Sequence, residues 1–251
     1  MLGMGIMVSC GNGQDKAKHK EPSNTENRES AVDTCSSNES SPPAILLDVN
    51  EFVDAEDTVR YKDYCFASYP IPDTVKTRMQ GKSMKDHARI SYDQLRYLTL
   101  PYYDYDGHIQ KGELVCNKRI AHELLCVFRD LFSKAYPINS IRLVDDFDAD
   151  DEASMQANNT SCFNYRTITG TNTLSQHAFG LAVDINPLQN PFIRGSHVHP
   201  ASATEYVDRT KDFPHKIDNN DFCKEVFVSY GFTWGGNWNK NKDYQHFEKR
   251  R

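Results

Sequence analysis

The sequence has no apolar run that reaches the ~18 residues needed for a transmembrane helix. It also lacks a basic stripe, and its formal net charge is −6, so nucleic-acid binding is disfavoured. Its seven cysteines show no C-x-x-C spacing and therefore indicate neither a structural metal site nor a definable disulfide framework. From residue 46 to residue 251 the chain is long enough to form one core, so we expect a single domain there.

The beginning of the chain differs from the rest in composition. Residues 10–45 are rich in Lys, Glu, Ser and Asn and contain few large apolar residues, so we expect a disordered tether. Residues 1–9 resemble the end of a bacterial lipoprotein signal peptide, with Val8-Ser9-Cys10 as the cleavage box. This resemblance implies lipidation of Cys10 and an extracytoplasmic, membrane-anchored protein. The alternative is a plain cytoplasmic N-terminus, because the apolar stretch is short and no Lys or Arg precedes it.

Two segments far apart in the sequence carry histidine and carboxylate side chains. The first is S-Q-H-A-F-G-L-A-V-D, which ends at Asp184, and the second is D-Y-Q-H-F-E, which begins at Asp243. A catalytic zinc ion takes three nitrogen and oxygen ligands and leaves a fourth position to water. His177, Asp184 and His246 supply such a set. Asp243, three residues before His246, remains as the base that would accept a proton from that water.

Local patterning supports the placement of these side chains. Residues 181–185 alternate with period two, so the apolar members face a core and Asp184 faces the other way on a strand. Gly180 permits a backbone conformation that brings His177 back beside Asp184. The same alternation at the C-terminus places Glu248 on the face of His246, where it would orient the imidazole.

These residues resemble the signature of the zinc D-alanyl-D-alanine carboxypeptidase and L-alanyl-D-glutamate peptidase family, which shares its metal core with the hedgehog domain. The signature is S-x-H-x-x-G-x-A-x-D, followed much later by an acidic residue three positions before a histidine. The resemblance implies an α+β fold of the hedgehog/DD-peptidase type over residues 46–251. It also implies His177, Asp184 and His246 as zinc ligands, Asp243 as catalytic base, and peptidoglycan peptides as substrates.

The resemblance extends to Phe163-Asn164-Tyr165-Arg166, where the family carries an arginine that faces the substrate. Arg166 is thus expected to stabilise an oxyanion or to hold a substrate carboxylate. Asn164 and Ser175 are further candidates for substrate binding. D-Ala-D-Ala carboxypeptidase activity is slightly favoured. The alternatives are an L-alanyl-D-glutamate endopeptidase and a non-catalytic zinc-containing module that binds the cell wall.

Other residues permit competing interpretations. Cys162 could be a nucleophile in contact with His177, but that mechanism would leave Asp184 and His246 without a role. The acidic run of residues 145–152 does not fit an EF-hand loop, and we expect it to be a solvated loop that caps a short helix. Aromatic residues close to His246 either line a pocket or belong to the core; they are Trp234, Trp238 and Tyr244.

The remaining patterns predict an antiparallel sheet with helices on one side. Residues 102–109 read as a hairpin with Asp-Gly in its turn, and Asn117 is expected to cap the helix that follows. Residues 140–144 have the β-branched content of a strand, and a second helix is expected over residues 220–230, ended by Gly231. Helices and strands in this order fit the α+β class.

Overall fold

The computed structural model describes residues 58–250. The predicted signal segment 1–9, the tether 10–45 and the first residues of the predicted domain, 46–57, lie outside the described residues. Between residues 58 and 250, no helix has the length and apolar composition needed to cross a membrane. The cysteines described there are free thiols.

The largest sheet has four antiparallel strands in sequential order. They are β1 (Thr58–Tyr61), β2 (Tyr64–Tyr69), β3 (Leu95–Tyr103) and β4 (Ile109–Asn117). The last two form the predicted hairpin, paired from Leu95 and Asn117 down to Tyr103 and Ile109. Gly107 in its turn has φ +78°, a value that glycine adopts without strain. The hairpin prediction is therefore confirmed.

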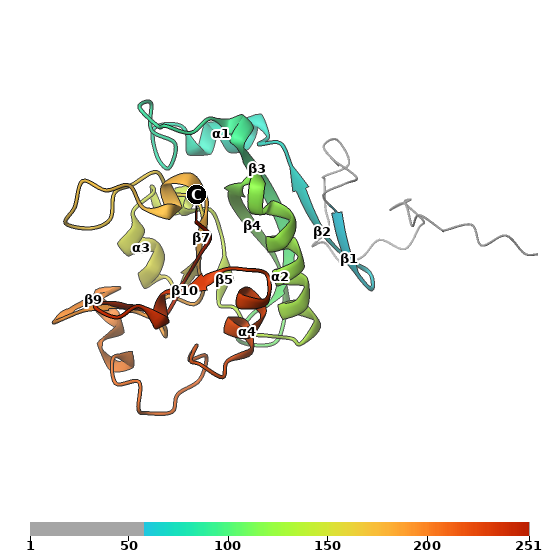
Figure 1. Cartoon of the computed structure of the whole chain (residues 1–251). Coiled ribbons are helices and arrows are strands. Elements are labelled where there is room, and N and C mark those ends of the chain that lie inside the picture. The colour runs from blue at the N-terminus through green and yellow to red at the C-terminus, as the bar shows by residue number, and fades with distance from the viewer. Residues whose placement is uncertain (1–57, 251) are drawn as a thin grey trace, which may run out of the picture. The chain divides into compact units, whose positions relative to one another are not determined.

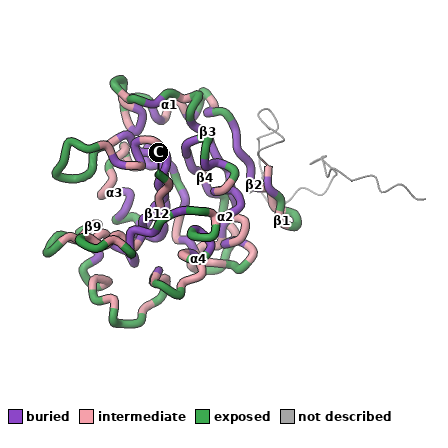
Figure 2. Tube along the Cα trace, in the orientation of Figure 1, coloured by how far each residue is buried: buried purple, intermediate pink, exposed green. Residues whose placement is uncertain are grey.

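Both faces of this sheet are covered. Leu98 and Leu114, opposite each other, belong to the core shared with α2 (Ala121–Ser133), whereas Tyr97 and Val115 belong to a second core shared with α1 (Asp73–Met79). Successive strand residues point to opposite faces, so the two cores lie on the two sides of the sheet. The prediction of helices on one side only is therefore wrong. Figure 2 shows the buried residues running along β3, β4 and α2.

Asn117 caps one helix and Gly231 ends another, as the sequence predicted for these two residues. Asn117 accepts a hydrogen bond from the N–H of Arg119 and caps η4 (Lys118–Ile120), which leads into α2. The second predicted helix is α4 (Phe222–Ser229), capped by Asp221 and ended by Gly231 at φ +80°. The predicted strand at 140–144 is shorter, because β5 covers Ser140–Ile141 only and η5 (Val144–Phe147) begins soon after it.

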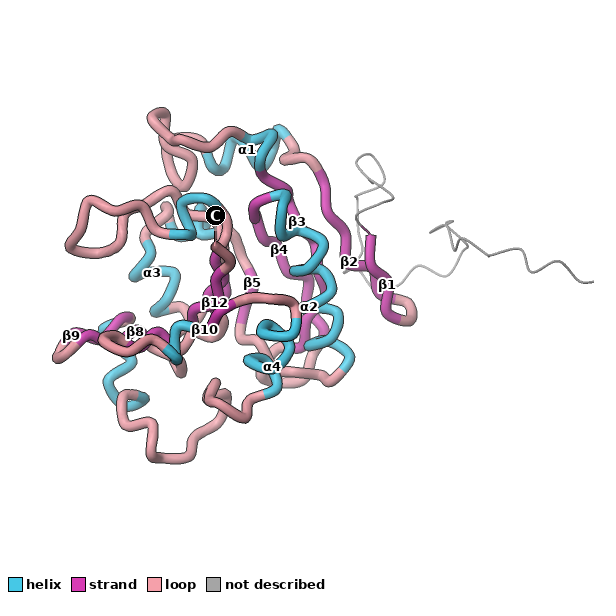
Figure 3. The backbone as a smooth tube through the Cα atoms, in the orientation of Figure 1, coloured by secondary structure: helices cyan, strands magenta, loops and turns pink. Residues whose placement is uncertain are grey.

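The rest of the chain forms small sheets rather than one large sheet. Their orders are β10-β12-β7, β11-β8-β9 and the parallel pair β5-β6. Each of these strands has only two or three residues, and turns or 3₁₀ helices separate them (Figure 3). A single antiparallel sheet was predicted, and the structure replaces it with several. The elements are β6 (Asn159–Thr160), β7 (Ala182–Asp184), β8 (Phe192–Arg194), β9 (His197–His199), β10 (Thr233–Trp234), β11 (Lys242–Asp243), β12 (His246–Glu248), α3 (Asp151–Gln156), η3 (Tyr92–Gln94), η6 (Gln176–Phe179), η7 (Ala201–Tyr206) and η8 (Gly235–Asn237).

The small sheet that contains β7 lies between the layer of β4 and α2 and the segment of α3 (Figure 1). Val183 and Phe247, opposite each other on β7 and β12, are fully buried in the core that α2 shares. The other face of the same two strands therefore points away from this core. The histidine and carboxylate side chains predicted from the sequence lie on that face.

Candidate metal centre

Two of the predicted ligands face each other across a strand pair. In the antiparallel pairing of β7 with β12, His246 lies directly opposite Asp184. Side chains at opposite positions of such a pair share one face, with Cβ atoms about 5 Å apart. The predicted alternation is thus observed, since Val183 and Phe247 point into the core. The face that carries Asp184 and His246 is also buried, with exposed fractions of 5% for each residue.

His177 reaches this face from the turn before β7. Ser175 caps η6 by accepting a hydrogen bond from the N–H of His177 at 3.3 Å. Gly180 follows with φ +62°, and a Cβ there would lie 2.6 Å from the backbone nitrogen of Asn117. That nitrogen donates a hydrogen bond to the Gly180 carbonyl at 2.8 Å. The absence of a side chain at Gly180 therefore lets the turn close against β4 and brings His177 beside Asp184.

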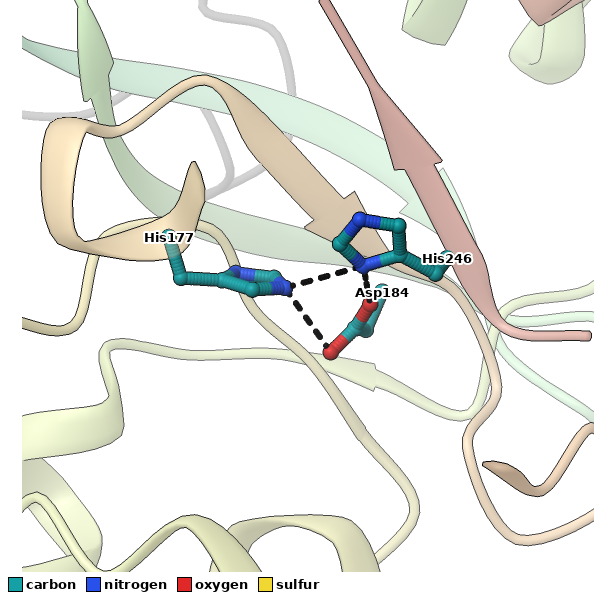
Figure 4. A group of neighbouring side chains, drawn as sticks. All are labelled: His177, Asp184 and His246. Carbon is teal, nitrogen blue, oxygen red and sulfur yellow. Dashed lines mark hydrogen bonds and ion pairs between the residues drawn. The ribbon is translucent and has the colours of Figure 1, made fainter. Parts of the chain in front are cut away.

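The three side chains converge on one small volume (Figure 4). His177 Nε2 lies 3.2 Å from Asp184 Oδ2, and His246 Nδ1 lies 3.0 Å from Asp184 Oδ1. The two ring nitrogens, His177 Nε2 and His246 Nδ1, are 3.2 Å apart. Two nitrogens and a carboxylate oxygen directed at one point are a donor set that fits a divalent metal ion.

The outer nitrogen of each imidazole has its own partner. His177 Nδ1 lies 2.6 Å from the carbonyl oxygen of Cys162, and His246 Nε2 lies 3.2 Å from Glu248 Oε2. Because a carbonyl or carboxylate oxygen accepts a hydrogen bond from the N–H of the nearer nitrogen, the lone pair of the other nitrogen faces the centre when the ring is neutral. The predicted neighbour of His246, Glu248, thus lies where it can orient the ring.

Electrostatics at the centre favour a positive charge. Burial alone would raise the pKa of Asp184, but His177 and His246 together hold it well below its usual range. Burial alone would lower the pKa of His246, but its bonds to Asp184 and Glu248 raise it to about 10. Two carboxylates that stabilise a protonated imidazole would also stabilise a bound cation, since both interactions are charge attractions in a region of low dielectric.

Asp243 lies close to the three convergent side chains, on β11. Its Oδ1 atom is buried and has no hydrogen-bond partner among the described residues. Burial raises the pKa of its carboxyl to about 7; His246 opposes this shift and Asp184 adds to it. A Cβ at Gly235 would lie 2.8 Å from the Asp243 Cβ and 3.3 Å from the His246 Cβ. The lack of a side chain at Gly235 therefore lets Asp243 and His246 pack closely against this position.

A cavity of about 870 Å³ opens onto this centre. Trp238 lines it, with its ring 5.3 Å from that of His246, whereas Trp234 is buried and donates a hydrogen bond to the carbonyl of Tyr244. Only Trp238 of the three predicted aromatic residues therefore borders the cavity. Several lining residues were not predicted from the sequence; they include Met155, Ile168, Leu174, Phe192, Arg194, His199 and Gln245.

Arg166 also lines the cavity, but its charge already has a partner. Its Nη2 atom lies 2.8 Å from Oδ2 of Asp151, the first residue of α3. Ser175 borders the cavity as well, although its hydroxyl accepts the His177 N–H. Asn164 does not border the cavity. It is buried, and its amide donates to the carbonyl of Ala149 at 3.3 Å, so its contacts are structural rather than directed at a substrate.

The acidic run is only partly the solvated loop that was predicted. Asp150 caps α3 by accepting from the N–H of Ala153, as expected. Asp145, however, is buried and accepts from both the backbone and the hydroxyl of Ser83. The run therefore connects distant parts of the chain, and its carboxylates are occupied by these contacts.

Cys162 does not have the surroundings of a nucleophile. Its thiol is buried, and burial raises its pKa well above the usual range, so the reactive thiolate is disfavoured. Its Sγ contacts the Gly180 carbonyl at 3.7 Å instead of the His177 ring. The contribution of this residue to the centre is its backbone carbonyl.

The centre is that of a candidate metal-dependent hydrolase. It combines two buried histidines, whose outer nitrogens are oriented by hydrogen bonds, with two carboxylates and an adjoining cavity. Comparison with known families agrees with this class. Residues 169–249 match the model of a family described as D-alanyl-D-alanine carboxypeptidase. The match includes His177, Asp184, Asp243 and His246, and it begins after Arg166. Searches of curated proteins and of solved structures gave no match.

Proposed function

We propose that the chain is a zinc peptidase that removes the terminal D-alanine from peptidoglycan stem peptides. The observation that carries this proposal is the convergence of His177, Asp184 and His246 beside the carboxyl of Asp243, whose Oδ1 atom is buried. Two imidazoles and one carboxylate, with a fourth position left for water, are the ligand type of catalytic zinc sites. The family match over residues 169–249 supports the class of substrate.

His177 Nε2, His246 Nδ1 and a carboxylate oxygen of Asp184 would hold the ion. When bound, zinc lowers the pKa of a coordinated water to about 7 and polarises a carbonyl oxygen. The Cys162 carbonyl and Glu248 keep the two rings oriented, so that their lone pairs remain directed at the ion.

Asp243 is suited to the role of general base. Its Oδ1 atom has no hydrogen-bond partner among residues 58–250 and is free to accept a proton. A carboxyl whose pKa is raised to about 7 by burial binds that proton firmly enough to return it later to the leaving amine. A module that only binds its ligand needs no such group, and this favours the enzyme over the non-catalytic alternative.

Arg166 would interact with the substrate from the wall of the cavity. A guanidinium presents paired donors that match a carboxylate or a polarised carbonyl oxygen. The contact with Asp151 holds Arg166 in place and leaves its other nitrogens available to the cavity. Its Nε atom is buried and has no partner within residues 58–250.

A defined pentapeptide tests the proposal. We expect the zinc-loaded protein to release one alanine from L-Ala-γ-D-Glu-L-Lys-D-Ala-D-Ala, as followed by product masses. Release of a peptide that begins at D-Glu would instead identify an L-alanyl-D-glutamate endopeptidase. Absence of any cleavage with zinc bound would favour the binding module.

We also propose an extracytoplasmic location with a lipid anchor at Cys10. Support comes from the Val8-Ser9-Cys10 sequence, which lies outside the described residues, and from a substrate found in the cell wall. The full-length protein is expected to take up labelled palmitate and to partition with membranes. Cys10→Ser should abolish both, whereas an unmodified Met1 in the intact mass would exclude the anchor.

A further inference from the structure

Most charged side chains in the wall of the cavity are already paired. Arg166 binds Asp151 at 2.8 Å. Glu152 accepts from the N–H of Ala201 at 2.6 Å and lies 3.1 Å from His199 Nδ1. These contacts tie α3 to the segments on either side of it. The charges of Arg166 and Glu152 are therefore already balanced by partners within the protein.

Arg194 differs from Arg166 and His199, the paired basic side chains of the wall. It lines the cavity, is half-buried, and makes no hydrogen bond or ion pair through its side chain with any part of the chain that the structure describes. A guanidinium that borders a cavity without a carboxylate partner is available to an anionic group of a ligand.

The strand pairing fixes where Arg194 lies. Phe192 is paired with Asp243, and Arg194 follows two residues later on β8. Side chains two residues apart on a strand share a face, and both Phe192 and Arg194 border the cavity, whereas Ile193 does not. Two residues of a strand span about 7 Å, so Arg194 lies outward from the position of the general base.

The guanidinium of Arg194 lies close to the loop of residues 167–174, which contributes Ile168 and Thr169 to the cavity wall. A Cβ at Gly170 would lie 3.6 Å from Arg194 Nη2. Gly170 belongs to the loop of residues 167–174, which begins and ends at the bridge between Thr167 and Leu174. In Figure 1 this loop and the β8-β9 hairpin both project from the same side of the fold. Arg194 thus lies in the cavity wall between the β8-β9 hairpin and the loop of residues 167–174.

We propose that Arg194 forms an outer subsite that binds a substrate carboxylate at least two residues away from the bond that is cleaved. The proposal rests on the proposed function. An extended peptide advances about 3.3–3.6 Å per residue, so the ~7 Å offset of Arg194 along β8 corresponds to about two substrate residues. Stem peptides carry suitable groups at this separation, namely the α-carboxylate of D-Glu and the side-chain carboxylate of diaminopimelate.

Two pairs of pentapeptides test the subsite. One pair compares D-Glu with its α-carboxamide, and the other compares diaminopimelate with lysine at the third position. For at least one pair, we expect the protein to prefer the acidic member in kcat/KM. Arg194→Gln should reduce this preference by about tenfold, mainly through KM, because an interaction remote from the reacting atoms contributes to ground-state and transition-state binding alike.

Matched variants separate recognition from structure. Arg194→Lys keeps the charge and should restore part of the preference, and Arg89→Gln, at an exposed arginine outside the cavity, should leave it unchanged. Equal losses for the acidic and the neutral peptides, or unchanged preferences for both pairs in Arg194→Gln, would overturn the proposal.

Calorimetry distinguishes failure of the subsite from failure of the proposed function. The same peptides can be titrated into zinc-loaded Asp243→Asn protein with and without Arg194→Gln. A preference that depends on Arg194 in binding, without turnover in the wild type, would retain the subsite and reject the peptidase. Turnover of the peptides without such a preference would support the peptidase and refute the subsite.

Discussion

Asp243→Asn isolates the role of the general base. Asparagine has nearly the same size and shape as aspartate, so the close packing against Gly235 is preserved. The asparagine amide cannot accept a proton at neutral pH. The substitution also breaks no hydrogen bond at Asp243 Oδ1, because this atom has no hydrogen-bond partner within the described residues. We therefore expect the fold and the bound metal to be retained while kcat falls by about 10²–10⁴-fold, the range typical of general-base catalysis.

The pH dependence gives the same variant a second readout. Burial raises the pKa of Asp243 to about 7. Only the ionised carboxylate accepts a proton, so kcat/KM of the wild type should rise as the pH increases through this pKa. A cation at the centre stabilises the carboxylate and lowers its pKa, so the rise is expected at or below about pH 7. The acidic limb should be absent in Asp243→Asn.

Cleavage of the pentapeptide, followed by chromatography and mass, measures both effects, with zinc content and thermal unfolding recorded for each protein. Asp86→Asn, at an exposed carboxylate outside the cavity, is the matched control and should behave as the wild type. If Asp243→Asn retains activity within a few-fold of wild type, Asp243 is not the base, and Glu248 becomes the next candidate.

Three further outcomes follow from the centre. His177→Ala and His246→Ala should each lose the bound zinc in elemental analysis, and wild-type metal content in both would refute the ligand assignment. Glu248→Gln should weaken zinc binding by about 10–100-fold in a competition titration, and an unchanged affinity would remove its orienting role. Gly180→Ala should destabilise the fold by more than the ~1–2 kcal/mol expected for a left-handed residue, because its Cβ would also clash with the Asn117 backbone. Chemical denaturation measures this loss, and Gly195→Ala, at φ +60° in open space, is the control. Equal losses of stability in the two variants would contradict the clash.

The local part of the site follows from the sequence. Alternation around Asp184 and His246 predicts which side chains leave the core, and the structure agrees because both strands pack Val183 and Phe247 against the layer of α2. The cap at Asn117 follows equally from a short-range rule, since a side chain that accepts a nearby N–H needs no distant partner.

The arrangement of the sheets could not be predicted from the sequence by these short-range rules. β7 ends at Asp184, and Asn186 adopts φ +46° soon afterwards, so the strand is too short to extend into a larger sheet. Alternation over a few residues indicates a strand but does not reveal its length or its neighbours, because these depend on long-range pairing. Strands of only two or three residues are therefore too short to be predicted from the alternation of residues alone.

The walls of the cavity depend most on contacts between distant segments. Arg166 was expected to face the substrate, and its partner Asp151 comes from a run that the sequence alone presents as solvated. Arg194 gave no signal, because its position follows from the pairing of β8 with β11. The proposed metal ligands and Asp243 suit either peptide bond, so we expect the choice between the two bonds to depend on the cavity wall, which includes Arg166 with its partner Asp151 and Arg194. Substrate preference should therefore change with substitutions in the cavity wall that leave the metal centre intact.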